Sequence, residues 1–221
     1  MNTILKALQV NPVFQKLSEA EREELASLAR VREIHKADFL CHHGDSWPYL
    51  FLITQGQIEA IKESLEGRSL LVASFQAHEI FWGLAFFDEE LPMPVSLVAR
   101  KTSRIYQWHR QTCLPFILQH GALAWELSRL MVKRMLHASD MVEELAFQSV
   151  SGRLARLLLE QFPADKQAVE RHLTLDDMAA RTGTTREMVC RILYRFAAQG
   201  AIQINRTEFV FTNRELLEKQ L

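Results

Sequence analysis

The fold of this chain is decided by the stretch at residues 184–195, which reads TTREMVCRILYR. The hydroxyl of Thr184 can accept a hydrogen bond from the backbone N–H near Glu187, and the Glu187 carboxylate can reach back to the Thr184 N–H. We therefore expect a helix to begin at Thr184. Apolar residues recur at helical spacing along one side of this helix: Val189, Ile192, Leu193 and Phe196. The polar side chains fall on the other side, which should face outward.

A shorter helical pattern precedes this stretch. It can start at Thr174, with Asp177 three residues later as the capping partner, and its apolar residues follow at Leu175 and Met178. Thr182-Gly183 supplies the turn between the two helices. The pair predicts a helix-turn-helix, which places its second helix in the major groove of DNA.

The outward side of the second helix carries side chains that can read bases. Arg186 and Arg191 can each donate two hydrogen bonds to guanine, and Glu187 can accept from the amino group of cytosine. The alternative is a surface helix with solvated arginines. We predict the following DNA contacts, which include a residue of the strand pair expected at 200–211: Thr184, Thr185, Arg186, Glu187, Cys190, Arg191, Arg195 and Arg206.

Composition places the protein among cytoplasmic chains with reduced thiols. The 221 residues are 48% hydrophobic, and three widely separated cysteines argue against a disulfide framework or a metal site. We find no membrane span and no signal peptide. Residues 1–146 carry a net charge of −3 and residues 147–221 a net charge of +2. This asymmetry is weak, so a DNA-binding patch must be local.

Short β-like runs follow one another between residues 31 and 110, after a helix expected near residues 18–29. Gly56 lies between two of them, Tyr49–Ile53 and Gln57–Ile61, as a turn signal. Many short strands at such spacing suggest a sandwich or barrel. The fold class expected is α+β, with a jelly-roll-like β-domain, a long helix and a C-terminal winged helix-turn-helix.

The motif TREMVCRIL at residues 185–193 resembles the recognition helix of the cyclic-AMP receptor and fumarate-nitrate regulator (Crp/Fnr) family of bacterial transcription regulators. Residues 31–110 are similar to that family's cyclic-nucleotide-binding β-roll. The resemblance implies a sensor domain at 1–111, a dimerisation helix at 112–146 and a DNA-binding domain at 147–221. It also implies a homodimer on an inverted-repeat operator containing TGTGA-like half-sites, with RNA polymerase as a partner.

The chain departs from the family pattern where relatives bind the cyclic nucleotide. The resemblance places a Glu that holds the ribose at Trp82-Gly83, and an Arg-Ser pair that holds the phosphate at Pro94-Val95. Loss of both polar anchors removes a charge-assisted pair and leaves a hydroxyl unpaired. We therefore expect no control by cyclic AMP.

Aromatic and apolar residues stand in this region instead. They either fill the pocket as core or line a pocket for an apolar or planar ligand. Haem is an alternative cofactor, although no histidine stands out as its ligand. The expected effector pocket includes two residues from the long helix: Trp82, Phe86, Phe87, Met93, Ala138 and Ser139.

Residues 112–146 form the longest helical pattern of the chain. Gly121 marks a bend within it or the end of a short preceding helix. A coiled-coil seam with steps of four and three predicts the dimer interface: Leu127, Met131, Arg134, Ala138, Met141 and Leu145. No catalytic constellation is present. Another class of function left open is a regulatory module that acts on a protein partner.

Overall fold

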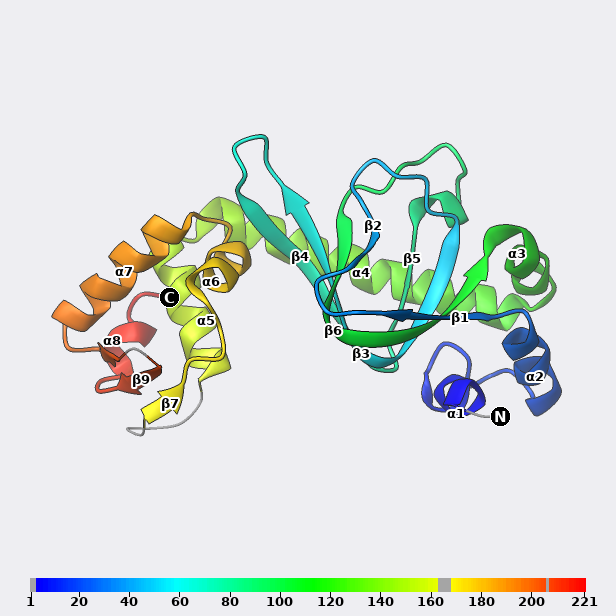
Figure 1. Ribbon diagram of the computed structural model, residues 1–221, viewed down its shortest axis with the longest axis horizontal. Coiled ribbons are helices and arrows are strands. Elements are labelled where there is room, and N and C mark those ends of the chain that lie inside the picture. The colour runs from blue at the N-terminus through cyan, green and yellow to red at the C-terminus, as the bar shows by residue number, and fades with distance from the viewer. Residues whose placement is uncertain (1–2, 163–167, 206) are drawn as a thin grey trace. The chain divides into compact units, whose positions relative to one another are not determined.

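The computed structural model describes residues 3–162, 168–205 and 207–221 (Figure 1). The contacts divide the chain into two compact units. The N-terminal unit comprises the chain up to Lys62 together with Val72–His137. The C-terminal unit comprises Glu63–Leu71 and Ala138–Leu221. The long helix is therefore shared between the two units.

The secondary structure is α+β, as expected. The helices are α1 (Thr3–Val10), α2 (Glu19–Ser27), a 3-10 helix (Leu84–Phe86), α3 (Arg110–Gln119), α4 (Gly121–Phe147), α5 (Val150–Gln161), α6 (Leu175–Thr182), α7 (Arg186–Ala198) and α8 (Glu215–Glu218). The strands are β1 (Arg30–Ile34), β2 (Phe39–Cys41), β3 (Tyr49–Glu63), β4 (Ser69–Gln76), β5 (Ile80–Trp82), β6 (Ser96–His109), β7 (Ala168–Glu170), β8 (Ile202–Ile204) and β9 (Glu208–Phe211).

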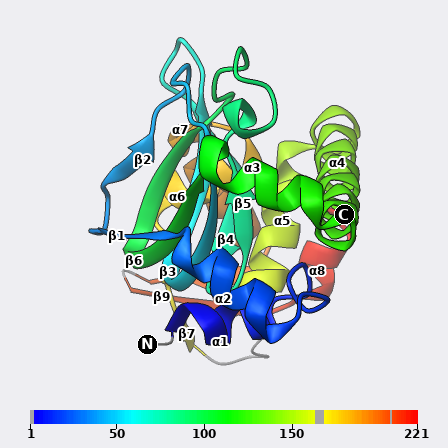
Figure 2. The same ribbon diagram turned by 90° about the vertical axis from the view of Figure 1, so that its right-hand side faces the viewer.

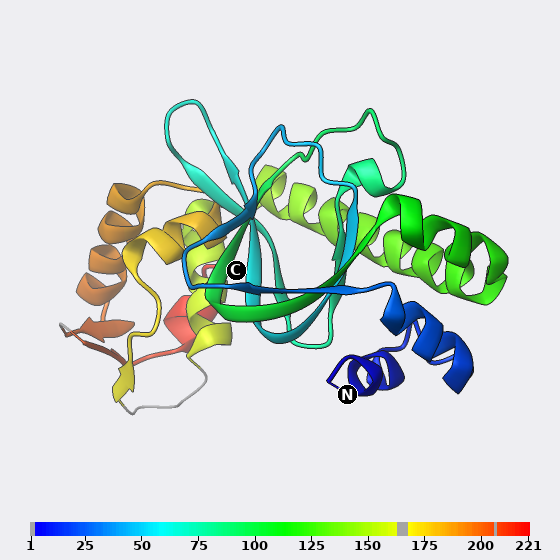
Figure 3. The same cartoon turned by 45° about the vertical axis from the view of Figure 1, so that its right-hand side comes forward.

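An antiparallel sheet forms the body of the N-terminal unit. Its strands run in the order β1-β6-β3-β4, with β2 also paired to β6 and β5 to β3. The first part of α4 packs along this sheet, and α1 and α2 pack against each other near one end of it (Figures 2 and 3). Trp108 of β6 is buried, and its indole N–H donates to the carbonyl of Leu25 at 2.7 Å, which fastens α2 to the sheet.

Gly56 does not form the turn that the sequence suggested. The runs on either side of it belong to one strand, β3, whose pairing with β6 shifts register between Ile53 and Ile58. Gly56 has φ +93°, and a Cβ there would lie 2.2 Å from the hydroxyl of Ser103. The glycine is therefore needed for a bulge that bends the strand.

Gly121 separates two helices, the second of the two alternatives that the sequence left open. α3 ends at Gln119 and α4 begins at Gly121, so that α4 has 27 residues. The residues of α4 that face the sheet, Leu123 and Leu127, join the same buried cluster as Trp82 and Phe86. This packing places one side of α4 in the core of the N-terminal unit.

The C-terminal unit packs helices α5 to α8 against a small antiparallel sheet in the order β7-β9-β8. The strand pair β8 and β9 forms the expected wing, whereas β7 was not predicted from the sequence. Arg153 of α5 is buried. It donates to the carbonyl of Thr182, at the end of α6, at 2.9 Å and to that of Gln148 at 2.6 Å.

Within the described ranges, none of the helices has the length and apolar character needed to cross a membrane. The same part of the chain contains no group of three or more histidine, cysteine, aspartate or glutamate side chains that could hold a metal ion. All three cysteines are free thiols.

Candidate nucleic-acid interface and effector region

The turn between α6 and α7 has the chemistry expected from the sequence. Thr174 caps α6 in a capping box with Asp177, whose carboxylate accepts from the Thr174 N–H at 2.9 Å. α6 ends at Gly183, which adopts the left-handed conformation with φ +61°. A Cβ at Gly183 would lie 2.9 Å from the side chain of Leu145. The turn therefore requires glycine for its backbone angle and for close packing.

The start of α7 differs from the prediction by one residue. Thr185, and not Thr184, is the N-cap, and its hydroxyl accepts from the Met188 N–H at 3.2 Å. The capping box proposed for Thr184 and Glu187 is therefore wrong. The Glu187 carboxylate interacts instead with its own backbone N–H and with the Thr185 hydroxyl, and these hydrogen bonds hold its pKa below the ordinary value. Glu187 is thus an anionic acceptor at neutral pH.

α7 is divided sharply between a buried and an exposed side. The apolar residues noted in the sequence, Val189, Ile192, Leu193 and Phe196, are buried in the core of the C-terminal unit. Arg186, Glu187, Arg191 and Arg195 are exposed, and Thr184, Thr185 and Cys190 are partly exposed. Arg206 lies outside the described residues. The remaining predicted contacts thus share one exposed helix and the turn before it.

The arginines of this side are held by local contacts. Arg186 forms an exposed ion pair with Asp176 of α6 at 3.5 Å, and Arg195 donates to the hydroxyl of Ser151 at 2.7 Å. Arg191 donates to the sulfur of Met188 at 3.0 Å. Such exposed contacts are weak, so that DNA phosphates and bases can replace them.

The sequence analysis missed Tyr194. Its side chain is 67% exposed, and it follows Cys190 by four residues and Arg191 by three, which places it on the same side of α7. The signal available was this spacing, because a large aromatic residue on the polar side of an amphipathic helix is unexpected in a solvated surface. A tyrosine there can contact a thymine methyl group with its ring and a phosphate with its hydroxyl.

The residues of the expected effector pocket are mostly core residues. Trp82 and Phe86 are buried in one cluster of the N-terminal unit, and Met93 is buried in another. Phe87 is exposed, and its ring contacts those of Trp82 and Phe86 edge to face, with ring centroids 5.9 and 5.2 Å apart. These aromatic rings pack on one another, the core arrangement that the sequence left open.

Ala138 and Ser139, the other two residues of the expected effector pocket, are exposed residues of α4 and belong to the C-terminal unit.

The side chain of Arg110, near the 3-10 helix, already has hydrogen-bond and ion-pair partners within the N-terminal unit. Arg110 donates to the carbonyls of Phe86 and Phe87 and pairs with Glu89 at 2.7 Å.

The coiled-coil seam predicted on α4 requires correction. Leu127 is buried, and Met131 packs against the same core cluster, because this side of α4 covers the sheet of its own unit. Arg134 lies over the ring of Phe75 at 4.7 Å. Leu127 is therefore covered by its own unit and Met131 and Arg134 are only partly exposed, while Ala138, Met141 and Leu145 are at least partly exposed.

A different apolar stripe of α4 is exposed. Its residues step by three and four: Trp125, Ser128, Val132, Met135, Ser139 and Val142. The exposed fractions of Trp125, Val132, Met135 and Val142 are 63%, 52%, 64% and 66%. We call these six residues the α4 stripe. The spacing is that of a coiled-coil seam, displaced from the predicted one around the helix.

Comparisons with known proteins agree with this architecture. Residues 31–120 match the sequence model of the cyclic nucleotide-binding domain, and residues 152–220 match that of the Crp-like helix-turn-helix domain. The chain is 24% identical over 212 residues to the cyclic AMP receptor protein of Thermus thermophilus, covering 95% of this chain and 96% of that protein. It is 25% identical over 224 residues to the anaerobic regulatory protein of Bacillus subtilis, covering 97% and 93%.

Solved structures show the same fold. A Crp/Fnr-family protein from Eubacterium rectale superimposes with a TM-score of 0.78 at 20% identity, covering 95% of this chain and 97% of that one. The c-di-GMP responsive global regulator CLP of Xanthomonas campestris gives a TM-score of 0.75 at 19% identity, covering 88% and 99%. With a cyclic nucleotide-binding domain followed by a Crp-like helix-turn-helix, this chain belongs to the Crp/Fnr family of transcription regulators.

Proposed function

We propose that this protein regulates transcription as a homodimer that binds an inverted-repeat operator, without control by a cyclic nucleotide. That it is a DNA-binding transcription regulator, and not an enzyme, follows from its family. The homodimer and its DNA contacts are supported by one observation: two helices expose sides that differ in polarity. α7 exposes charged side chains, and α4 exposes an apolar stripe at coiled-coil spacing.

The α4 stripe supports a parallel pairing of two α4 helices. The stripe contains four large apolar side chains and two serines, Ser128 and Ser139. The serines are small enough to allow two helix backbones to approach. Burying exposed apolar surface is favourable by about 25 cal/mol per Å². Each copy would contribute the same residues, as two-fold symmetry requires. A dimer then presents two α7 helices to DNA.

The exposed side of α7 supports sequence-specific contacts. We propose that Arg186, Glu187 and Arg191 contact base edges, and that Thr184, Thr185, Cys190 and Arg195 line the same interface. We add Tyr194 to this set because of its exposure and position. RNA polymerase is the partner expected of the DNA-bound dimer, in keeping with the family.

Selection of binding sites from a random DNA library tests the operator. We expect an inverted repeat of G/C-containing half-sites resembling TGTGA, with centres about 34–36 Å apart, which is one turn of DNA. Sedimentation velocity on the free protein should show a dimer at micromolar concentration. Selected sites without two-fold symmetry, or a monomer that binds such sites tightly, would contradict the proposed homodimer.

The aromatic packing around the 3-10 helix supports independence from cyclic nucleotides. Trp82 stacks on Phe81 with ring centroids 5.7 Å apart, and a Cβ at Gly83 would lie 1.8 Å from the carbonyl of Trp47. Side chains and backbone thus pack tightly at the position where the family resemblance places the ribose-binding glutamate. The buried Val95 occupies part of the position assigned to the phosphate-binding pair.

Calorimetric titration with cyclic AMP and with cyclic GMP tests the proposed independence from cyclic nucleotides. Absence of both polar anchors should move the dissociation constant beyond the millimolar range. A dissociation constant below about 100 μM for either nucleotide would refute it. The Thermus relative, named a cyclic AMP receptor protein, serves as the positive control.

A further inference from the structure

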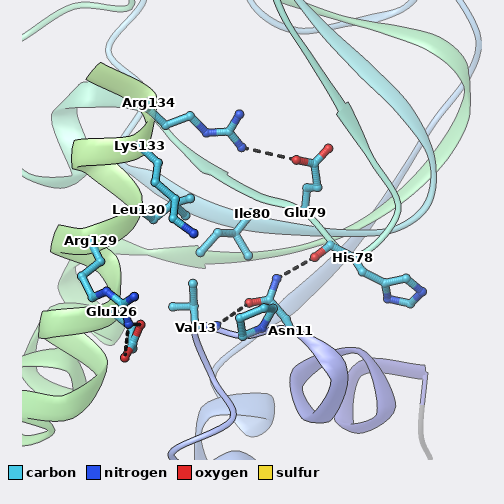
Figure 4. Close-up of a pocket in the computed structure, with 11 residues that line it drawn as sticks. Asn11, Val13, His78, Glu79, Ile80, Glu126, Arg129, Leu130, Lys133 and Arg134 are labelled. Carbon is cyan, nitrogen blue, oxygen red and sulfur yellow. Dashed lines mark hydrogen bonds and ion pairs between the residues drawn. The ribbon is translucent and has the colours of Figure 1, made fainter. Parts of the chain in front are cut away.

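The N-terminal unit contains a cavity beside α4. It has a volume of about 260 Å³ and lies between the segment after α1, the turn from β4 to β5, and α4 (Figure 4). Its lining includes Asn11, Val13, Glu79, Ile80, Leu130, Lys133 and Arg134. None of the residues predicted for the effector pocket lines it.

One wall of the cavity is held by a buried amide. Asn11 is only 4% exposed, and its side-chain N–H donates to the carbonyl of His78 at 2.6 Å while its oxygen accepts from the Val13 N–H at 2.9 Å. His78 has φ +71°, a left-handed conformation that is uncommon for a residue other than glycine. Its imidazole points away from α4 (Figure 4). The wall is therefore a formed surface and not a chance gap between loops.

The carboxylates at the cavity are already neutralised or hydrogen-bonded. Glu126 pairs with Lys16 at 2.7 Å and with Arg129 at 3.1 Å, and the Lys16 hydrogen bond holds the pKa of Glu126 below its ordinary value. Glu79 accepts from the Gln76 N–H at 2.7 Å and lies 3.6 Å from Arg134. The negative charge at the cavity therefore has partners.

Two cations on α4 have unused hydrogen-bonding capacity. Lys133 forms no ion pair or hydrogen bond with any residue in the described part of the chain. The Nε–H of Arg134 is buried without an acceptor, while its guanidinium lies over Phe75. The Nη2 of Arg134 lies 3.6 Å from a carboxylate oxygen of Glu79, longer than a hydrogen bond, so this nitrogen can still donate to an anionic oxygen. Both side chains extend from α4 toward Glu79, in the turn before β5, and Ile80, the first residue of β5 (Figure 4).

The floor of the cavity is apolar. Val13 and Ile80 are buried, and Leu130 is partly buried against the same core cluster. The volume lies below the range typical of sites for drug-sized ligands, so the ligand must be small. An inorganic ion would leave the apolar floor without contacts, whereas a ligand with a compact apolar body would cover it.

We propose that this cavity binds a small organic monocarboxylate, whose carboxylate pairs with Lys133 and Arg134 and whose apolar body lies on Val13, Ile80 and Leu130. The cavity shares no lining residue with the predicted effector pocket, although Ile80 and Trp82 belong to the same strand, β5. Binding at this site does not depend on the proposed operator or on the proposed homodimer.

Calorimetric titration of the full-length protein with benzoate tests the proposal. Benzamide, which has the same shape without the charge, and inorganic phosphate, which has charge without the apolar body, are the matched controls. We expect saturable binding of benzoate with a dissociation constant below about 1 mM, and binding at least about tenfold weaker for each control. Absence of saturable benzoate binding, or equal binding of benzamide, would overturn the proposal.

Two variants locate the site. Lys133→Gln removes a partly solvated charge that no described residue uses, so the protein should remain folded and lose benzoate affinity by about tenfold or more. Lys101→Gln removes a comparable exposed charge from β6 and should leave affinity unchanged. Leu130→Phe fills the cavity from the apolar side and should abolish binding with an unchanged unfolding temperature. Wild-type affinity in the folded Lys133→Gln variant would place the ligand elsewhere and refute the assignment.

Discussion

The long helix α4 and the reading helix α7 are both amphipathic, but their exposed sides differ in chemistry. α4 buries Leu123 and Leu127 in the N-terminal unit, and α7 buries an apolar side in the C-terminal unit. α7 exposes arginines and a glutamate, whereas α4 exposes Trp125, Val132, Met135 and Val142. The buried side of a helix is apolar in proteins of any function, so it gives no information about the partner. The exposed side identifies the partner, which is a charged polymer for α7 and, in our proposal, a second copy of the chain for α4.

The largest effect is expected from a charge in the α4 stripe. Val132→Asp would place two like charges in the proposed seam and should cost the dimer about 3–5 kcal/mol, which raises its dissociation constant by more than about a hundredfold. Sedimentation equilibrium measures this change. Val132→Leu keeps the stripe apolar and should remain dimeric. A dimeric Val132→Asp protein would show that the stripe serves another partner.

The corrected position of the seam matters for this experiment. Met131, which the sequence pattern had placed in the seam, packs against the core of the N-terminal unit. A charge at Met131 should therefore destabilise that unit, and loss of DNA binding in such a variant would not report on the dimer.

The next effect concerns base contacts on α7. Arg191→Ala should cost about 1–3 kcal/mol of operator binding and relax specificity at one base pair of each half-site. Arg129→Ala, an exposed arginine on α4, is the matched control and should leave DNA binding unchanged. Fluorescence anisotropy with operator and random DNA measures both. An equal loss on both DNAs would make Arg191 a phosphate contact.

A smaller effect is expected from modification of Cys190. Burial raises the pKa of Cys41 and of Cys113 to about 12, so both should resist iodoacetamide at neutral pH, whereas Cys190 is partly exposed on the reading side of α7. Mass spectrometry should find a single modified cysteine. The added group should weaken operator binding by about 1 kcal/mol, or roughly fivefold. Unchanged affinity after complete modification would show that Cys190 lies outside the DNA interface.

The smallest effect is expected at Asp176, which pairs with Arg186 on the protein surface. Asp176→Asn frees the arginine and removes a negative charge near the DNA, so operator affinity should rise by about threefold, less at high salt. Asp140→Asn, on α4, is the control. A fall in affinity would mean that Asp176 positions Arg186 for its base contact.

Local signals allowed more of the C-terminal unit to be predicted than of the N-terminal one. The capping box of Thr174 and Asp177 and the turn at Gly183 depend on neighbouring residues, and both were correctly predicted. The cap of α7 was misplaced because two threonines stand side by side, and both can accept from the next turn. The sequence pattern alone cannot distinguish them.

The N-terminal unit depends on contacts between distant segments. Gly56 carries the same signal whether it forms a turn or a bulge, and Ser103, far along the chain, decides between them. The seam predicted on α4 includes Leu127 because apolar residues occur on both sides of that helix, and only the packing of Leu127 on the sheet shows which side is buried. The cavity beside Lys133 joins three segments that no local pattern connects.

The buried Arg153 has a consequence for how such regulators diverge. Its guanidinium ties the end of α6 to the residue that follows α4, and a lysine, with one ammonium group in place of a planar fork, cannot make both bonds in the same geometry. The buried Arg153 thereby helps to fix the position of the helix pair α6 and α7 without reaching the surface. Substitutions on the outer side of α7 can accumulate without moving the helix. New operator preferences can therefore arise one base pair at a time without a change in the buried scaffold.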